Sequence, residues 1–126
     1  MNYKLLVIFS IVFLILDITW ISFFSRYFNP MIEAIQKKPV KINMIGAVLA
    51  YLVMLYAYYN LAYDGDVPNY QKAALLGLAI YGTYEFTNLA TIAGWDYKIL
   101  AIDISWGVTV SVLSLFITDM IYRYMK

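Results

Sequence analysis

The chain has 126 residues, of which 63% are hydrophobic, 18% aromatic and 13% charged, and its formal net charge is +1. Soluble domains carry roughly 25% charged residues, so this composition predicts a membrane protein. A net charge of +1, with basic residues scattered between apolar runs, argues against a nucleic-acid partner. Because Cys and His are absent, thiolate and imidazole ligands are excluded, and we expect neither a metal site nor a cofactor.

Residues 5–24 form the first expected membrane span. The run is apolar except for a few polar residues, and at about 1.5 Å per residue it crosses roughly 30 Å of hydrocarbon. Lys4 precedes it, as in a secretory signal, but the run is too long for one and ends without a small-residue cleavage site. We therefore predict an uncleaved span.

Residues 31–38 are predicted to form a short interfacial helix between the first two spans. Asn29 can cap this helix, Pro30 can occupy its first turn and Pro39 can stop it. The apolar residues of the segment would face lipid and its polar residues would face water.

Three further spans are expected at residues 42–63, 73–95 and 99–122, separated by turns at 64–68 and 94–98. The chain is thus predicted to be all-α, a single domain (residues 1–126) folded as an antiparallel bundle of four transmembrane helices. Both termini then lie on one side of the membrane, the terminal side, and residues 25–41 and 94–98 lie on the other, the loop side. Small residues four apart in the spans favour close helix packing, within one chain or in a homo-oligomer, and the expected partners are membrane lipids.

The basic residues do not decide the orientation of the bundle. The terminal side carries four (Lys4, Lys72, Arg123 and Lys126) and the loop side five (Arg26, Lys37, Lys38, Lys41 and Lys98). This distribution has almost no bias. Four of the five loop-side basic residues lie in one loop, which favours an orientation with both termini outside the cell or compartment. Insertion of the chain in both orientations is the alternative.

Three acids interrupt the apolar spans: Asp17, Glu85 and Asp103. No Lys, Arg or His within the spans can neutralise them, and an ionisable group in hydrocarbon is costly unless it is paired, protonated or hydrated, so these acids are functional-site candidates. Residue counting places all three in the loop-side half of the membrane. Because like charges repel, we expect at least one of them to be neutral.

Helical spacing groups aromatic and polar side chains with the acids. Leu16–Trp20 and Ile102–Trp106 share an Asp-x-x-Trp pattern, which predicts that each indole donates to the opposite carboxylate; an ancient repeat is the alternative explanation. The predicted ligand or proton-binding pocket consists of Asp17, Trp20, Tyr81, Tyr84, Glu85, Thr87, Asn88, Thr91, Asp103 and Trp106.

Two groups of residues have competing interpretations. Thr87, Asn88 and Thr91 could complete an oxygen shell for a hard cation, although Thr in a membrane helix often bonds its own backbone. The second span is rich in tyrosine, which favours an interfacial aromatic belt over a wall for a ring or polyene ligand (Tyr51, Tyr56, Tyr58, Tyr59 and Tyr63).

Residues 81–91, Asp103-Ile-Ser-Trp-Gly107 and the Asp17–Trp20 pair together resemble an uncharacterised family of small predicted membrane proteins, domain of unknown function 2177. The similarity extends from end to end, although Glu85-Phe86 stands where the family usually has Asp-Leu. The resemblance implies a four-helix membrane protein of bacteria and some large viruses, and it implies no activity.

Three functions remain open from the sequence. The leading hypothesis is a membrane protein that binds or transports a small ligand with proton or cation exchange. A lipid-modifying enzyme using carboxylate acid/base chemistry is the first alternative. The second is a structural membrane or virion-membrane protein without a ligand, in which the polar groups specify helix pairing.

Overall fold

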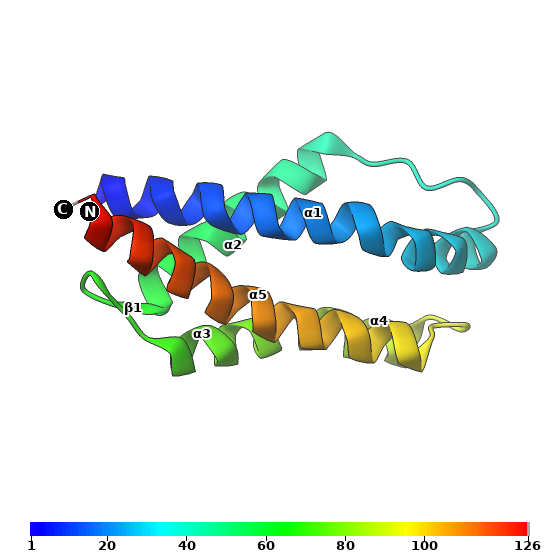
Figure 1. Cartoon of the computed structure of the whole chain (residues 1–126). Coiled ribbons are helices and arrows are strands. Elements are labelled where there is room, and N and C mark those ends of the chain that lie inside the picture. The colour runs from blue at the N-terminus through cyan, green and yellow to red at the C-terminus, as the bar shows by residue number, and fades with distance from the viewer. Residues whose placement is uncertain (126) are drawn as a thin grey trace.

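Helices account for nearly all of the computed structural model, which describes residues 1–125 (Figure 1). This is expected, because a backbone in lipid must satisfy its own hydrogen bonds. The elements in chain order are α1 (Tyr3–Gln36), α2 (Met44–Leu61), β1 (Tyr63–Asp64), β2 (Val67–Pro68), α3 (Tyr70–Gly77), the π-helix η1 (Leu78–Gly82), α4 (Thr83–Thr91) and α5 (Tyr97–Tyr124).

The expected all-α membrane fold is confirmed. Helices α1, α2 and α5 are each long and apolar enough to cross a membrane. Residues 70–91 are helical without interruption through α3, η1 and α4, and this third helical segment of the chain runs beside α5. The two ends of the chain lie next to each other at one end of the bundle (Figure 1).

Asn and Asp side chains set the start of each membrane helix. Asn2, Asn43, Asn69 and Asp96 each accept a backbone N–H from the first turn of α1, α2, α3 and α5, respectively. The third helical segment therefore begins three residues before the expected Ala73. It ends at Thr91, because Ile92 is extended and Gly94 has a φ of 87°, so Trp95 lies outside the helix.

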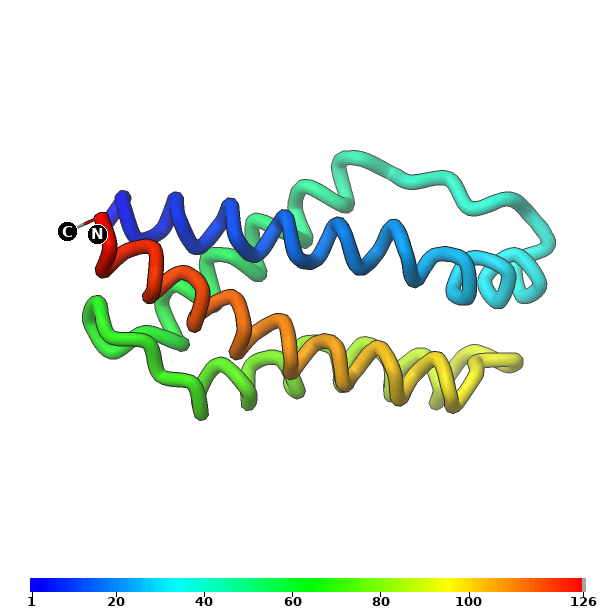
Figure 2. The backbone as a smooth tube through the Cα atoms, in the orientation of Figure 1, coloured from blue at the N-terminus to red at the C-terminus, as the bar shows by residue number. Residues whose placement is uncertain are grey.

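The interfacial helix expected at residues 31–38 is not a separate element. Helix α1 continues through Pro30 to Gln36, and the coil in Figure 2 is unbroken up to its end. Proline removes one helical hydrogen bond, but its φ fits a helix. The Asp96 N–H also contacts Met31 Sδ at 3.3 Å, which ties this extension to the loop before α5. The helix stops at Lys37, which has a left-handed φ of 58°.

The buried core lies in the terminal-side half. Phe9, Phe13 and Tyr58 form its centre, with ring centroids 5.2–5.8 Å apart. Figure 1 shows α1 and α5 close together near the termini and further apart toward the loop side. The buried residues of α2, Leu55 and Tyr58, both belong to its second half, so its first half is packed more loosely against the bundle.

Glycine permits a close contact between α3, η1 and α5. A Cβ atom on Gly77 would overlap the Gly107 carbonyl, and one on Gly107 would overlap the ring of Tyr81. The close packing expected from small residues in the spans is thus present where α3 and η1 meet α5.

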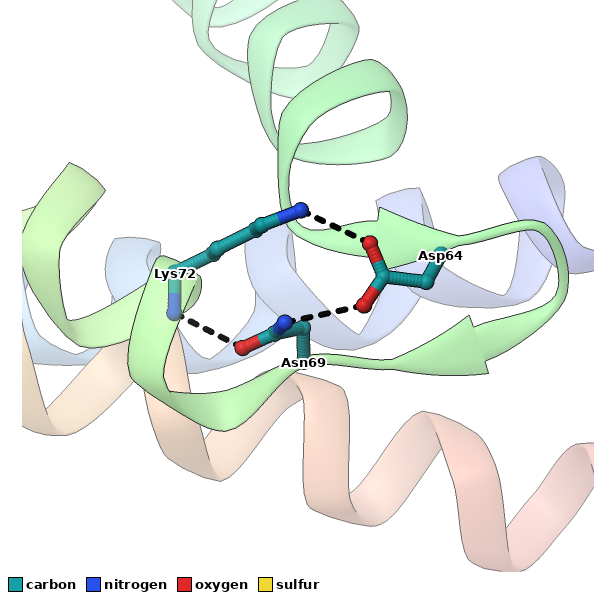
Figure 3. A network of polar contacts seen from close by, with 3 residues as sticks. All are labelled: Asp64, Asn69 and Lys72. Atoms are coloured by element: carbon teal, nitrogen blue, oxygen red, sulfur yellow. Dashed lines mark hydrogen bonds and ion pairs between the residues drawn. The ribbon is translucent and has the colours of Figure 1, made fainter.

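A polar network caps the terminal end, where the expected turn at residues 64–68 is a two-residue ribbon of β1 and β2 (Figure 3). Lys72 Nζ lies 2.8 Å from Asp64 Oδ1, and Asn69 Nδ2 donates to Asp64 Oδ2 at 2.9 Å. These hydrogen bonds, first that of Lys72, hold the pKa of Asp64 below its ordinary value.

Candidate functional site

Asp17 is the centre of a hydrogen-bond network that joins all the spans. It is 2% exposed and accepts bonds from three neutral donors on other elements. Tyr51 donates to Oδ2 at 2.6 Å, and Tyr81 and Trp106 Nε1 donate to Oδ1 at 3.1 and 2.9 Å. Carboxylate bonds to such donors are stronger than neutral ones, so the network can hold a charge without a cation.

Local structure explains how two of these donors reach Asp17. Tyr81 lies within η1, and a π-turn displaces side chains from the α-helical register. Its ring rests on Gly107, where any larger residue would push it away. Trp106 is the neighbour of that glycine on α5.

Tyr51 was expected in an interfacial belt, and the structure instead turns it inward to Asp17. The sequence holds one signal for this position. Tyr51, Leu55 and Tyr58 are spaced four and seven residues apart on one face of α2, and Leu55 and Tyr58 are buried. Sequence reasoning missed the signal because the lipid-facing side of α2 is equally apolar.

The predicted exchange of indole bonds between the two Asp-x-x-Trp motifs is present in one direction. Trp106 donates to Asp17, while Trp20 stacks on Trp106 with centroids 4.7 Å apart and an interplanar angle of 11°. Trp20 faces Asp103, but its buried Nε1 has no partner with hydrogen-bond geometry among residues 1–125.

Glu85 and Asp103 form an acidic pair beside the Asp17 network. Glu85 is completely buried, and its Oε2 accepts the Trp95 Nε1 proton at 3.1 Å. Its other oxygen, Oε1, has no hydrogen-bond partner in the described chain, although Asp103 is its neighbour. Trp95 was not predicted in the site, because its place depends on where the helix before it ends.

The remaining predicted pocket residues divide into two groups. Tyr84 and Asn88 are neighbours on α4 beside the acidic pair. Thr87 and Thr91 are exposed, and Thr91 Oγ1 donates to the Thr87 carbonyl at 2.8 Å. Both threonines thus lie on the outside of the bundle, and residues 1–125 contain no group of three or more acidic side chains that could hold a metal ion.

A cavity of about 450 Å³ lies in the loop-side half, between α1, α2, η1 and α5. Its walls are mostly apolar, and Asp17 and Asp103 lie on them. Phe24 and Phe28 continue the aromatic stack of Trp20 along the α1 wall, with centroids 5.1 and 5.9 Å apart in turn. The other lining residues are Ile21, Ser25, Asn29, Ala47, Ala50, Tyr51, Met54, Ile80, Tyr81 and Tyr84.

The sequence matches one family model over residues 2–120, and that family is described as "Predicted membrane protein (DUF2177)". No curated protein and no solved structure matches the chain.

Proposed function

The chain belongs to the DUF2177 family of predicted membrane proteins, and from the residues that line its cavity we propose that it binds a small hydrophobic cation and exchanges it for protons. The observation that carries the proposal is the position of Asp103 on the wall of an apolar, aromatic-lined cavity with no cationic side chain.

The two carboxylates on the cavity wall have different hydrogen bonding. Asp17 already accepts three hydrogen bonds, one of them from a tyrosine of α2, so its charge is largely stabilised by the protein. Asp103 lies between Glu85 and Trp20, whose polar atoms Oε1 and Nε1 lack hydrogen-bond partners among the described residues. A bound cation beside Asp103 would supply the missing positive charge, and we assign Asp103 the direct contact.

The aromatic wall supports a cation of organic character. Trp20, Phe24 and Phe28 lie along one side of the cavity, and the faces of such rings attract cations as well as apolar groups. A small inorganic ion would gain little from this wall.

Access from the lipid follows from the position of α2. Its first half contributes Ala47 and Ala50 to the cavity and has no buried residue of its own. An amphiphilic ligand can therefore enter sideways from the membrane, past small side chains.

The proton side of the exchange follows from the acidic pair. Two neighbouring carboxyl groups without a cation cannot both ionise cheaply in a membrane, whereas a bound cation makes ionisation of both favourable. Binding would thus release a proton from the pair formed by Glu85 and Asp103.

The test uses two ions of the same shape and opposite charge, tetraphenylphosphonium and tetraphenylborate. We expect the chain in zwitterionic nanodiscs to bind the phosphonium saturably, with quenching of tryptophan fluorescence, and to release protons into a weakly buffered solution. Tetraphenylborate should give neither signal. Asp103→Asn should weaken phosphonium binding at least about tenfold, a change of roughly 1.4 kcal/mol.

The matched control is Asp66→Asn, which removes the same charge from an exposed residue outside the spans. Equal binding of both ions, or equal effects of the two substitutions, would contradict the proposal.

A lipid-modifying enzyme is the second candidate, because Asp103 on the cavity wall next to buried Glu85 is also a plausible arrangement for acid/base catalysis. Incubation of the purified chain with a total lipid extract, followed by mass spectrometry, separates the two. New lipid species formed by the native chain and absent with Asp103→Asn would favour the enzyme.

A further inference from the structure

The positive charges at the two ends of the bundle differ in how they are neutralised. On the loop side, Arg26, Lys37, Lys38, Lys41 and Lys98 form what we call the loop-side basic patch. We propose that this patch binds the phosphate groups of anionic phospholipids and anchors the loop end of the bundle in an anionic leaflet. This inference is independent of the ligand proposed for the cavity.

The basic residues of the terminal end have partners within the protein. Lys72 pairs with Asp64 at 2.8 Å, as Figure 3 shows, and Arg123 pairs with Asp119 at 3.0 Å. Lys4 Nζ donates to the Met125 carbonyl at 3.2 Å. The fourth residue counted on this side, Lys126, lies outside the described residues. These charges are therefore largely satisfied within the chain.

The loop-side basic patch has no such partners. Its five residues are exposed, and none of them forms an ion pair within residues 1–125. The acids nearby serve other groups: Asp96 caps α5 through the N–H groups of Lys98 and Ile99, and Glu33 Oε1 accepts the Val40 N–H at 3.5 Å. The patch is thus a concentrated positive charge that needs counter-charges from outside the chain.

Contacts bring the end of α1, next to Lys37 and Lys38, beside the start of α5, next to Lys98. The Asp96 N–H contacts Met31, and Gly94 adjoins Ile35, so the ends of α1 and the start of α5 lie side by side. Exposed aromatic residues accompany the basic ones: Arg26 lies over the Phe23 ring at 5.0 Å, and Tyr27 and Tyr97 are exposed. Tyrosine and basic residues together are typical of the headgroup region, where each Lys or Arg gains from anionic lipid.

Phospholipid phosphate is the partner that this chemistry favours. The patch borders apolar helix surface on α1 and α5, so a lipid can place its chains against the helices while its phosphate contacts the lysines. A soluble anion would gain only the second contact, and that contact weakens as salt is added.

The experiment compares two variants that each lose three positive charges. One carries Lys37→Gln, Lys38→Gln and Lys41→Gln; the matched control carries Lys4→Gln, Lys72→Gln and Arg123→Gln. Each chain is purified from mixed phosphatidylglycerol and phosphatidylcholine, and the retained lipids are quantified by mass spectrometry. Circular dichroism and thermal unfolding establish that both variants are folded.

We expect the native chain to retain phosphatidylglycerol in excess over the mixture. The loop-side variant should lose this enrichment by about fivefold or more, given the attraction of each basic residue to an anionic surface. The control should retain it. A native chain without enrichment, or a control that loses as much as the loop-side variant, would overturn the inference. A free phosphate source is tested by adding inorganic phosphate, which should not displace the lipid at constant ionic strength.

Discussion

In the terminal-side half Phe9, Phe13 and Tyr58 fill the space between converging helices, whereas in the loop-side half Trp20, Phe24 and Phe28 stack along one wall of a cavity. Both groups of aromatic residues contain α1 side chains in the same helical repeat. Their roles differ because of the helix opposite: Tyr58 of α2 packs on Phe9 and Phe13, whereas the first half of α2 has no buried residue. Figure 2 shows the start of α2 rising away from α1.

Polar groups follow the same division. In the terminal-side half, Ser111 and Ser114 donate to carbonyls one turn back on α5, and Tyr58 bonds to Ser111. Such short-range bonds cost little in lipid and leave no charge. In the loop-side half, carboxyl groups require donors from several helices. The comparison teaches that one half of the bundle is organised for packing and the other for holding charge.

The largest expected effect is on packing. Phe13→Ala should lower the free energy of unfolding by roughly 2–4 kcal/mol, because converging helices cannot fill the hole. Phe28→Ala, on the cavity wall, should cost less than about 1 kcal/mol, because space already adjoins that ring. Equilibrium unfolding in bicelles measures both. Equal losses of unfolding free energy would mean that the loop-side half is as closely packed as the terminal-side half, which would contradict the difference between the two halves.

The two cavity acids give the next contrast. Asp17→Asn should destabilise the fold by about 1–3 kcal/mol, because an amide offers one acceptor oxygen to three donors. Asp103→Asn is the matched substitution and should cost less, since among residues 1–125 no hydrogen bond to Asp103 has the geometry of the three bonds at Asp17. The same unfolding assay applies. A greater loss for Asp103→Asn would show that the second acid, and not the first, joins the helices.

Part of the fold and of the candidate site could be predicted from the sequence. The four helical segments and the bond from Trp106 to Asp17 were predictable, because apolar length and helical spacing decide them. The inward turn of Tyr51 and the bond from Trp95 to Glu85 were not. Both depend on how each helix is rotated and where it stops, which packing decides in a membrane whose lipid is as apolar as the core.

Pro30 and η1 show the same limit at the level of the backbone. A proline preceded by Asn29 predicted a helix start, yet contacts with the loop before α5 hold the segment as one helix. Nothing in the sequence from Leu78 to Gly82 distinguishes a π-turn from an α-turn. At Pro30 a tertiary contact therefore overrode a local signal, whereas at η1 the sequence offered no signal to read.

Two tyrosines of α2 allow a smaller comparison within one helix. Tyr51→Phe and Tyr58→Phe each remove one hydroxyl bond, to Asp17 and to Ser111, and each should cost about 1 kcal/mol of stability. Only Tyr51→Phe should also change tetraphenylphosphonium binding, because only Tyr51 lines the cavity. A change of binding with Tyr58→Phe would show that the two halves are coupled.

The smallest effect concerns the terminal end, where Asp64 is exposed and bonded to Lys72 and Asn69. Because its pKa is lower in the fold than its ordinary value of 3.8, the network contributes stability above pH 3.8 and loses it as the pH falls through the lower folded value. Lys72→Gln removes the first cause of the shift, so the Asp64 carboxyl should titrate at higher pH in that variant, as carbon-13 NMR can measure. Lys98→Gln, at the other end of the bundle, should leave the titration of Asp64 unchanged.

The same two substitutions should have little effect on stability. Since Asp64 is open to solvent, salt will weaken the ion pair, and thermal unfolding should hardly respond to either substitution. A large stability loss with Lys72→Gln would mean that the hairpin, which lies outside the spans, helps to hold the helices of the terminal-side half together.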